Sequence, residues 1–455
     1  LAETRWRALL AAGGNPRALL PLVRTETLAL HELSIPRVTL PAHHRGGVVV
    51  RSGKEQIGRR LSQLTERFVE EQLAVLAAAI PRRVATPRAR LRESAREVAA
   101  VLQREEEAQT GEMGPFLRRG SAGRAVAWAA WARVSGDGEA RKRALWHVAH
   151  LVHQLEREDF RQWLFGFGSG LGGVVYALAC CGRWLETPKL LNLASELAEQ
   201  AVNSSTLKDH LDVEAGLAGL LLGVAALPGR KGAWLSERLA LELGSAVAQA
   251  KPEDGHGSIL SPGFAHGLSG VAAALLRASQ VTGNRRWAEQ AVGFLEREPR
   301  AGSWLAEAAV SNGGHLAVSL NGWCHGPAGA LAARELVPVK LRTADIARQI
   351  HEARARVIPL KLATPLSLCC GSIARSEISL IVGELAGDQH LMDEAKKLAA
   401  LLFGSGLWRQ ELDPNGGLFE GLPGFLFHIC RLLAPEQVGS VLIAQQQPQT
   451  MGPVL

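Results

Sequence analysis

The hydrophobic pattern of this chain is dominated by short segments that are apolar on nearly every side, each following a G-x-x-G step. A helix that is apolar all round has to be buried, whereas the intervening segments, such as residues 287–298, are amphipathic and belong on an outer layer. The steps are 45 to 59 residues apart, which is room for two helices and two connections. They begin at Gly170, Gly216, Gly267, Gly326 and Gly421, and a degraded copy without the second glycine begins at Gly371.

Six copies of this unit predict an all-α (α/α)6 toroid, with buried inner helices and amphipathic outer ones. In each step the first glycine ends a loop where backbones crowd together, and the second lets the next helix start close to its neighbours. The glycine loops then share one end of the ring. We therefore expect functional side chains from several repeats to meet there.

The first hundred residues lack the repeat and predict a small helical segment ahead of the toroid. One helix ends before Pro36, and a second runs over about residues 56–79 and stops at Pro81. Pro81, Pro87 and the arginine-rich stretch between them indicate a junction.

These boundaries divide the chain into a helical segment at 1–84, a linker at 85–110 and the toroid at 111–455. The chain opens on Leu1 and not on Met, within a helical pattern. We interpret it as part of a longer protein.

The composition agrees with packed helices, because the chain is 47% hydrophobic but only 5% aromatic. The net charge of +7 arises in residues 1–120, where 20 Lys or Arg face 13 Asp or Glu, since the remaining residues hold 31 of each. Such a segment could hold an acidic partner, although a solvated helical face is the simpler interpretation. No nucleic-acid-binding module accompanies it.

Cysteine usage and hydropathy predict a cytoplasmic protein. Six cysteines in 455 residues are too few for a disulfide scaffold, and four of them form two vicinal pairs, which favours a reducing compartment. No apolar run reaches transmembrane length, and no signal peptide is visible.

Two strings carry the strongest chemical signal. N-G-W-C-H-G contains Cys324, and S-L-C-C-G, 45 residues further on, contains Cys369 and Cys370. Zinc is readily bound by cysteine thiolates, which the fold can bring together from distant segments. Two adjacent cysteines cannot both occupy one ordinary core position. If the three meet, they form a zinc site with an open fourth position, as catalytic zinc requires. The other cysteines are interpreted as small buried hydrophobes: Cys180, Cys181 and Cys430.

Six strings, which include the two cysteine strings, carry a family resemblance when taken in order: F-G-S-G-L-G-G-V-V-Y-A-L, L-D-V-E-A-G-L-A-G, G-F-A-H-G-L-S-G-V-A, N-G-W-C-H-G-P-A-G, L-C-C-G and G-L-F-E-G-L-P-G. Together they make the C-terminal three quarters of the chain resemble the lanthionine cyclase (LanC-like) domain of class II lanthipeptide synthetases of the LanM type. The string E-T-L-A-L-H-E-L-S-I-P resembles the last helices of the dehydratase domain that precedes this cyclase. The resemblance therefore implies that residues 1–84 are a dehydratase remnant without its catalytic machinery.

The implied activity is a zinc-dependent ring closure. A cysteine thiol of a precursor peptide adds to dehydroalanine or dehydrobutyrine and forms a lanthionine or methyllanthionine thioether. In the family, two Cys and the His of a C-H-G motif usually bind the zinc, but here the motif is C-C-G, as in a subgroup of relaxed cyclases. The resemblance implies one zinc ion per chain on Cys324, Cys369 and Cys370. Its implied partners are the dehydrated precursor peptide and the rest of the dehydratase domain.

Acid–base roles follow from the same resemblance. His266 corresponds to the acid/base, and Asp212 to the carboxylate that fixes its tautomer. Without the resemblance, both would be interpreted as helix caps. His325 follows a zinc-ligand candidate directly. It is a candidate for protonating the enolate that forms when the thiol adds to the dehydroamino acid. Stand-alone cyclases commonly carry an Arg where this chain has Leu320, so Arg375 is an alternative for that role.

Three other functions remain open at this point. A glutathione-adding LanC-like enzyme shares the fold and the zinc, but the dehydratase-like N-terminus argues against it. A non-catalytic, zinc-stabilised peptide-binding scaffold would use the cysteines without His266. An (α/α)6 glycosidase would need a carboxylate pair from Asp212, Glu214, Glu377 or Glu420. Histidines in polar glycine-rich loops are expected at the surface: His43, His44 and His315.

Overall fold

The computed structural model describes residues 87–108, 113–157, 159–204, 206–250, 263–298, 322–358 and 366–445. They belong to one compact unit that spans residues 86–455. The helical segment and dehydratase remnant expected at residues 1–84 lie outside the described residues, as do His43, His44, His315 and Leu320. In the described ranges the chain forms no β-strand and no helix long and apolar enough to cross a membrane. The expected all-α class is confirmed.

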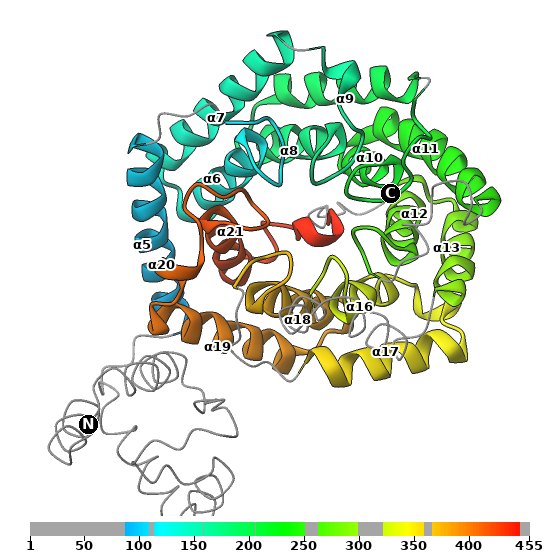
Figure 1. Cartoon of the computed structure of the whole chain (residues 1–455). Helices are drawn as coiled ribbons and strands as arrows, with labels where there is room; N and C mark the ends of the chain where they lie inside the picture. Colours follow the sequence, from blue (N-terminus) through cyan, green and yellow to red (C-terminus); the bar gives the residue numbers. More distant parts are fainter. Residues whose placement is uncertain are drawn as a thin grey trace, which may run out of the picture. The chain divides into compact units, whose positions relative to one another are not determined.

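An inner ring of seven helices forms the centre of this part of the chain (Figure 1). Each packs against the next along the chain, and the last packs against the first, so the ring closes. Their residues are buried on nearly all sides, as the apolar pattern predicts. In chain order they are α6 (Ser121–Ser135), α8 (Leu171–Trp184), α10 (Leu217–Val224), α12 (Leu268–Thr282), α16 (Pro327–Glu335), α18 (Ser372–Ala386) and α21 (Leu422–Leu433).

An outer layer of seven amphipathic helices surrounds the ring in the same described residues (Figure 1). Each packs against at least one inner helix, and α11 packs against both α10 and α12. In the order of their inner partners they are α7 (Gly138–Arg157), α9 (Pro188–Val202), α11 (Gly229–Gln249), α13 (Arg285–Arg297), α17 (Ala344–Val357), α19 (Gln389–Ser405) and α5 (Pro87–Ala108). The described residues also contain four short elements: η1 (Phe160–Gln162), η4 (Val339–Leu341), α20 (Trp408–Glu411) and η5 (Val441–Ile443).

The expected toroid is therefore present, but it has seven helical pairs in the described residues where the repeat predicted six. The additional inner helix, α6, follows a G-S-A-G step that begins at Gly120. Arg124 interrupts the apolar pattern just after this step, which hides the copy. Arg124 is nevertheless buried, because Glu106 of α5 pairs with it at 2.9 Å.

The second correction concerns the linker predicted at residues 85–110, because Pro87–Ala108 within it form helix α5. Pro87 suggested a junction, but proline is well tolerated in the first turn of a helix, where its missing N–H costs nothing. The helix packs against α21 and α19 and so supplies the outer partner of the last inner helix. Four apolar residues at helical spacing are buried on one face: Leu91, Ala95, Val98 and Leu102.

In six of the seven steps the second glycine is required by close backbone contact, and the step at Gly371 has Ala374 instead. A Cβ atom on Gly173 would lie 2.1 Å from the carbonyl oxygen of Phe167, and one on Gly270 would lie 1.9 Å from that of Phe264. Each of these loops therefore lies directly on the first turn of the helix that follows it. The same contact, to the carbonyl six residues earlier, occurs at Gly123, Gly219, Gly329 and Gly424.

The seven loops are joined into a closed belt by backbone hydrogen bonds from each loop to the next. In every case an N–H of one loop donates to a carbonyl of its neighbour, and the last loop donates to the first. The donor–acceptor pairs are Arg118 to Gly168, Phe167 to Val213, Val213 to Ala265, Ala265 to Cys324, Trp323 to Cys369, Cys369 to Phe419 and Leu418 to Leu117.

The segment that contains η5 lies in the middle of the ring in Figure 1. The indole Nε1 of Trp323 donates to the carbonyl of Leu442 at 2.9 Å, and Arg277 Nη2 donates to that of Ala444 at 2.9 Å. Trp323 is fully buried and stacks on Phe419, with ring centroids 5.4 Å apart. This segment therefore supports the belt from inside the ring, next to Cys324.

A buried ionic cluster joins α18 to α21. Glu377 accepts from His428 Nδ1 at 2.7 Å and from Arg431 Nε at 3.0 Å, and all three side chains are inaccessible to solvent. Burial opposes the charge on Glu377, but Arg431 and then His428 outweigh it, so the pKa of Glu377 falls to about 2. The carboxylate is thus ionised and stabilises the contact between these two inner helices.

Replacing Glu377 with Gln is expected to lower the free energy of unfolding at pH 7 by about 3 kcal/mol or more, because breaking a buried ion pair leaves a charge uncompensated. The folded pKa of Glu377 lies below its ordinary value of 4.5. Its contribution is therefore complete above pH 4.5 and is lost as the pH falls from there towards 2. Urea unfolding of wild type and variant should show a smaller difference at pH 3.5 than at pH 7.

Glu289→Gln, on the exposed face of α13, is the matched control and should change stability by less than about 0.5 kcal/mol. An E377Q variant with the wild-type urea midpoint at pH 7 would contradict this account.

Candidate metal centre and active site

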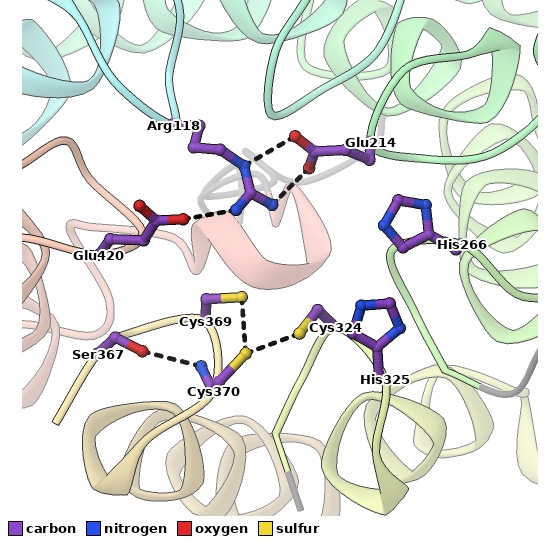
Figure 2. A pocket seen from close by; sticks show the side chains of 9 residues that line it. All are labelled: Arg118, Glu214, His266, Cys324, His325, Ser367, Cys369, Cys370 and Glu420. Carbon is purple, nitrogen blue, oxygen red and sulfur yellow. Dashed lines mark hydrogen bonds and ion pairs between the residues drawn. The ribbon is translucent and has the colours of Figure 1, made fainter. Parts of the chain in front are cut away.

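A cavity of about 400 Å³ opens at the belt end of the ring (Figure 2). Eight of its nine lining residues occupy one of the two positions directly before the first glycine of a step. At these positions the backbone is held by the belt, and the side chain is free to face the cavity. The lining residues are Arg118, Glu214, His266, Cys324, His325, Ser367, Cys369, Cys370 and Glu420.

The three cysteines meet as the sequence predicted. Their sulfur atoms all lie within 4.8 Å of one another, with Cys324 Sγ 2.7 Å and Cys369 Sγ 3.1 Å from Cys370 Sγ. Ser367 Oγ accepts a hydrogen bond from the backbone N–H of Cys370 at 3.1 Å and fixes the turn that presents this thiol. Three soft donors that face one cavity could hold a metal ion and leave one coordination position for a ligand from that cavity.

The thiols are also electrostatically coupled. Hydrogen bonds from Cys324 and then Cys369 lower the pKa of Cys370 to about 3, because both thiols stabilise its thiolate. The pKa of Cys369 is raised well above its usual range by its hydrogen bonds with Cys324 and Cys370. The cluster therefore carries negative charge at neutral pH, which suits it to a cation.

His266 and Asp212 form a hydrogen-bonded pair beside this cluster. His266 Nδ1 lies 2.7 Å from Asp212 Oδ2, and Asp212 Oδ1 accepts from the backbone N–H of Ala215 at 2.8 Å. Asp212 thus caps its own turn and also orients the imidazole, so both interpretations of this residue are realised. Because Nδ1 is engaged, Nε2 is the nitrogen that His266 can present to a ligand.

His325 stacks on His266, with ring centroids 5.0 Å apart and an angle of 17° between the planes. Burial, and then the neighbouring His266, lower the pKa of His325. His325 is therefore neutral at physiological pH.

An ionic group around Arg118, a residue that the sequence motifs did not indicate, forms the opposite wall of the cavity (Figure 2). Arg118 Nε and Nη2 donate to the two carboxylate oxygens of Glu214 at 2.8 and 2.9 Å, and Nη1 donates to Glu420 at 2.7 Å. Arg119 also pairs with Glu420, and Ser169 Oγ donates to Glu214. The signal that could have found Arg118 is its place two residues before Gly120, the start of the unrecognised step.

Several other candidates lie elsewhere. Arg375 is on α18, where Nη2 donates to the carbonyl of Val357 at 3.2 Å, and it does not line the cavity. The carboxylates of Glu214 and Glu420 share Arg118, and Glu377 is in the buried cluster, so these three do not form the pair that a glycosidase needs. The remaining cysteines are buried in the core, as expected: Cys180, Cys181 and Cys430.

Fold and site together define a helical toroid with a thiolate cluster at its loop end. Residues 111–443 match the family described as lanthionine synthetase C-like protein, and the chain belongs to this family. Among solved structures, a nisin cyclase is similar with a TM-score of 0.57 and 15% sequence identity, over 77% of this chain and 96% of that one. At this identity the likeness shows the shared fold. No curated protein sequence matches the chain.

Removing one thiol of the cluster is expected to weaken metal binding by more than the roughly 10–100-fold loss that outer-shell changes cause. Metal content after dialysis and the thiolate-to-metal absorption of the Co²⁺-loaded protein should show one ion per wild-type chain and much less in Cys324→Ser. Cys430→Ala, in the core, should retain the wild-type stoichiometry. Equal metal content in Cys324→Ser and wild type would refute the three-thiol site.

Proposed function

We propose that this chain is a zinc-dependent lanthipeptide cyclase of the LanM type. It adds cysteine thiols of a dehydrated precursor peptide to dehydroalanine or dehydrobutyrine and so forms lanthionine and methyllanthionine rings. The observation that carries this proposal is the meeting of a three-thiol cluster and an aspartate-oriented histidine in one cavity. Membership of the lanthionine synthetase C-like family supports it.

The donor set fits zinc, because Cys324, Cys369 and Cys370 supply soft thiolates and the cavity leaves room for a fourth ligand. Zinc bound there would hold the substrate thiol as a thiolate at neutral pH. The negative charge of the cluster, two of whose cysteines are buried while Cys370 is half-buried, fits this role.

His266 is assigned as the group that removes the proton from the incoming thiol. Asp212 stabilises the imidazolium that results and keeps Nε2 directed at the reacting atoms. Ring closure then needs a proton on the α-carbon of the acceptor. His266 can return one, and His325, in contact with the same ring, is the candidate that relays it.

The proposal extends to the setting of the reaction. We infer that residues 1–84 are the end of a dehydratase domain and that the dehydrated precursor peptide comes from that domain. The free thiols of the described chain fit the reducing cytoplasm.

Replacing His266 with Asn is expected to slow ring closure at least about 100-fold, because general acid–base groups contribute roughly 10²–10⁴-fold. The assay uses a precursor peptide that a partner enzyme has already dehydrated, and surviving thiols are counted by alkylation and mass spectrometry. His153→Asn, an exposed histidine on α7, should behave as wild type.

The rival scaffold function predicts equal thiol loss with wild type and with H266N, at the rate of the sample without protein. If the wild-type chain is inactive, the same assay with the complete dehydratase domain restored decides the question. Inactivity there too would refute the cyclase.

The C-C-G motif has its own expected consequence. Three thiolates outweigh the charge of a zinc ion by one, whereas two thiolates and a histidine balance it, so the substrate sulfur is more electron-rich at this site. Cys370→His should retain zinc but close rings about tenfold more slowly, equivalent to about 1.4 kcal/mol in the barrier. An unchanged single-turnover rate with zinc still bound would refute this role for Cys370.

A further inference from the structure

Arg118 is the only arginine or lysine among the described residues that line the cavity. Its guanidinium projects from the wall opposite the cysteines, between Glu214 and Glu420 (Figure 2). Its side chain is 24% exposed. The cavity thus has thiols on one side and a single cation on the other.

The hydrogen bonds of Arg118 leave it with donors to spare. A guanidinium carries five N–H groups, and three are engaged, two by Glu214 and one by Glu420. The other two are available to an oxygen atom in the cavity. Burial works against the charge of Arg118, but the hydrogen bonds and charge of Glu214 outweigh it and raise the pKa, so the cation persists at all relevant pH values.

The surroundings hold this group in one orientation. The bidentate contact with Glu214 fixes the plane of the guanidinium, and Ser169 Oγ donates to the same carboxylate at 2.7 Å. Gly168 leaves space for it, because a Cβ atom there would lie 2.2 Å from Glu214 Oε2. The backbone belt already joins the loops that carry these residues, so the fold does not need the ion pairs to connect them.

The proposed reaction needs a hydrogen-bond donor at the carbonyl oxygen of the acceptor. When the thiolate sulfur bonds to the β-carbon of the dehydroamino acid, the electron pair of the C=C bond moves towards the adjacent amide carbonyl. The carbonyl oxygen becomes an enolate oxygen until the α-carbon takes up a proton. That proton replaces the one lost by the thiol, so the addition consumes no oxidant, reductant or further reactant.

We propose that Arg118 donates a hydrogen bond to the carbonyl oxygen of the dehydroamino acid and stabilises its negative charge as the carbon–sulfur bond forms. Arg118 is then a catalytic residue, and Glu214 and Glu420 are positioning residues that aim its free N–H groups. This inference rests on the proposed cyclase function. It assigns one wall of the cavity to the sulfur nucleophile and the facing wall to the carbonyl of the acceptor.

The test compares Arg118→Met, Arg118→Lys and Gly168→Ala with wild type, in the protein with its dehydratase domain if the assay above requires it. Gly138→Ala, where a Cβ meets nothing within 4 Å, is the control for Gly168→Ala. Zinc per chain, the Co²⁺–thiolate absorption and the thermal midpoint report the integrity of the site. Single-turnover ring closure at saturating peptide, and KM in steady state, report catalysis.

We expect R118M to retain its zinc and its Co²⁺ spectrum and to change KM only a few-fold. It should close rings about 10²–10³-fold more slowly, which is the usual cost of losing one hydrogen-bond donor to a developing oxyanion. R118K should recover part of the rate, because lysine keeps the positive charge but lacks the several fixed N–H donors of the guanidinium. G168A should lower the rate without loss of zinc, because the added Cβ displaces the Glu214 carboxylate.

Two results would overturn the inference while leaving the cyclase function intact. One is a single-turnover rate within threefold of wild type in R118M and G168A. The other is loss of zinc or of folding in R118M together with a wild-type rate in G168A, which would make Arg118 a structural residue. A wild-type protein that closes no rings faster than the control without protein would instead refute the proposed function.

Discussion

The closed belt of backbone hydrogen bonds between the seven loops is the constraint on which the site depends. The belt joins the loops at the end of the inner ring where the glycine steps lie. In six of the seven steps the second glycine allows close contact between the loop and the first turn of its helix, whereas the step that begins at Gly371 has Ala374 at this position. The glycines therefore determine how closely each loop packs on its inner helix. This packing places the side chains of the loop, several residues away, at the cavity.

Because the belt places equivalent positions of all repeats around one axis, the chemistry of the cavity is decided by which side chain each repeat carries there. The fifth and sixth loops contribute thiols, the fourth and fifth contribute imidazoles, and the first, third and seventh contribute the arginine and its two carboxylates. Residues up to 302 positions apart in the chain thus touch one another. Thiols, imidazoles and a guanidinium therefore face the same space.

The sequence was most informative where the chemistry is local. Cys324, Cys369 and Cys370 stand in short strings whose residue types alone indicate a metal site, and the structure brings the three sulfurs together. His266 and Asp212 could be paired only through the family resemblance, since 54 residues separate them. The hydrophobic pattern predicted the toroid because buried inner helices must be apolar all round.

The errors have equally physical causes. The first repeat was not recognised because Arg124 follows its glycine step, and its burial depends on Glu106 in another helix. The sequence predicts a linker at residues 85–110 because Pro81, Pro87 and the arginines between them indicate a junction, although proline is tolerated in the first turn of helix α5 and only one face of the helix has to be apolar. Arg118 was missed because its partners are 96 and 302 residues away, which no local pattern reveals.

X-ray absorption spectroscopy at the zinc edge, with and without the dehydrated precursor peptide, tests the proposed three-thiol zinc site most directly. We expect three sulfur ligands at about 2.3 Å in the protein alone and four when the peptide binds, because its thiol takes the open position. A histidine among the zinc ligands, or three sulfur ligands both with and without peptide, would contradict this proposal.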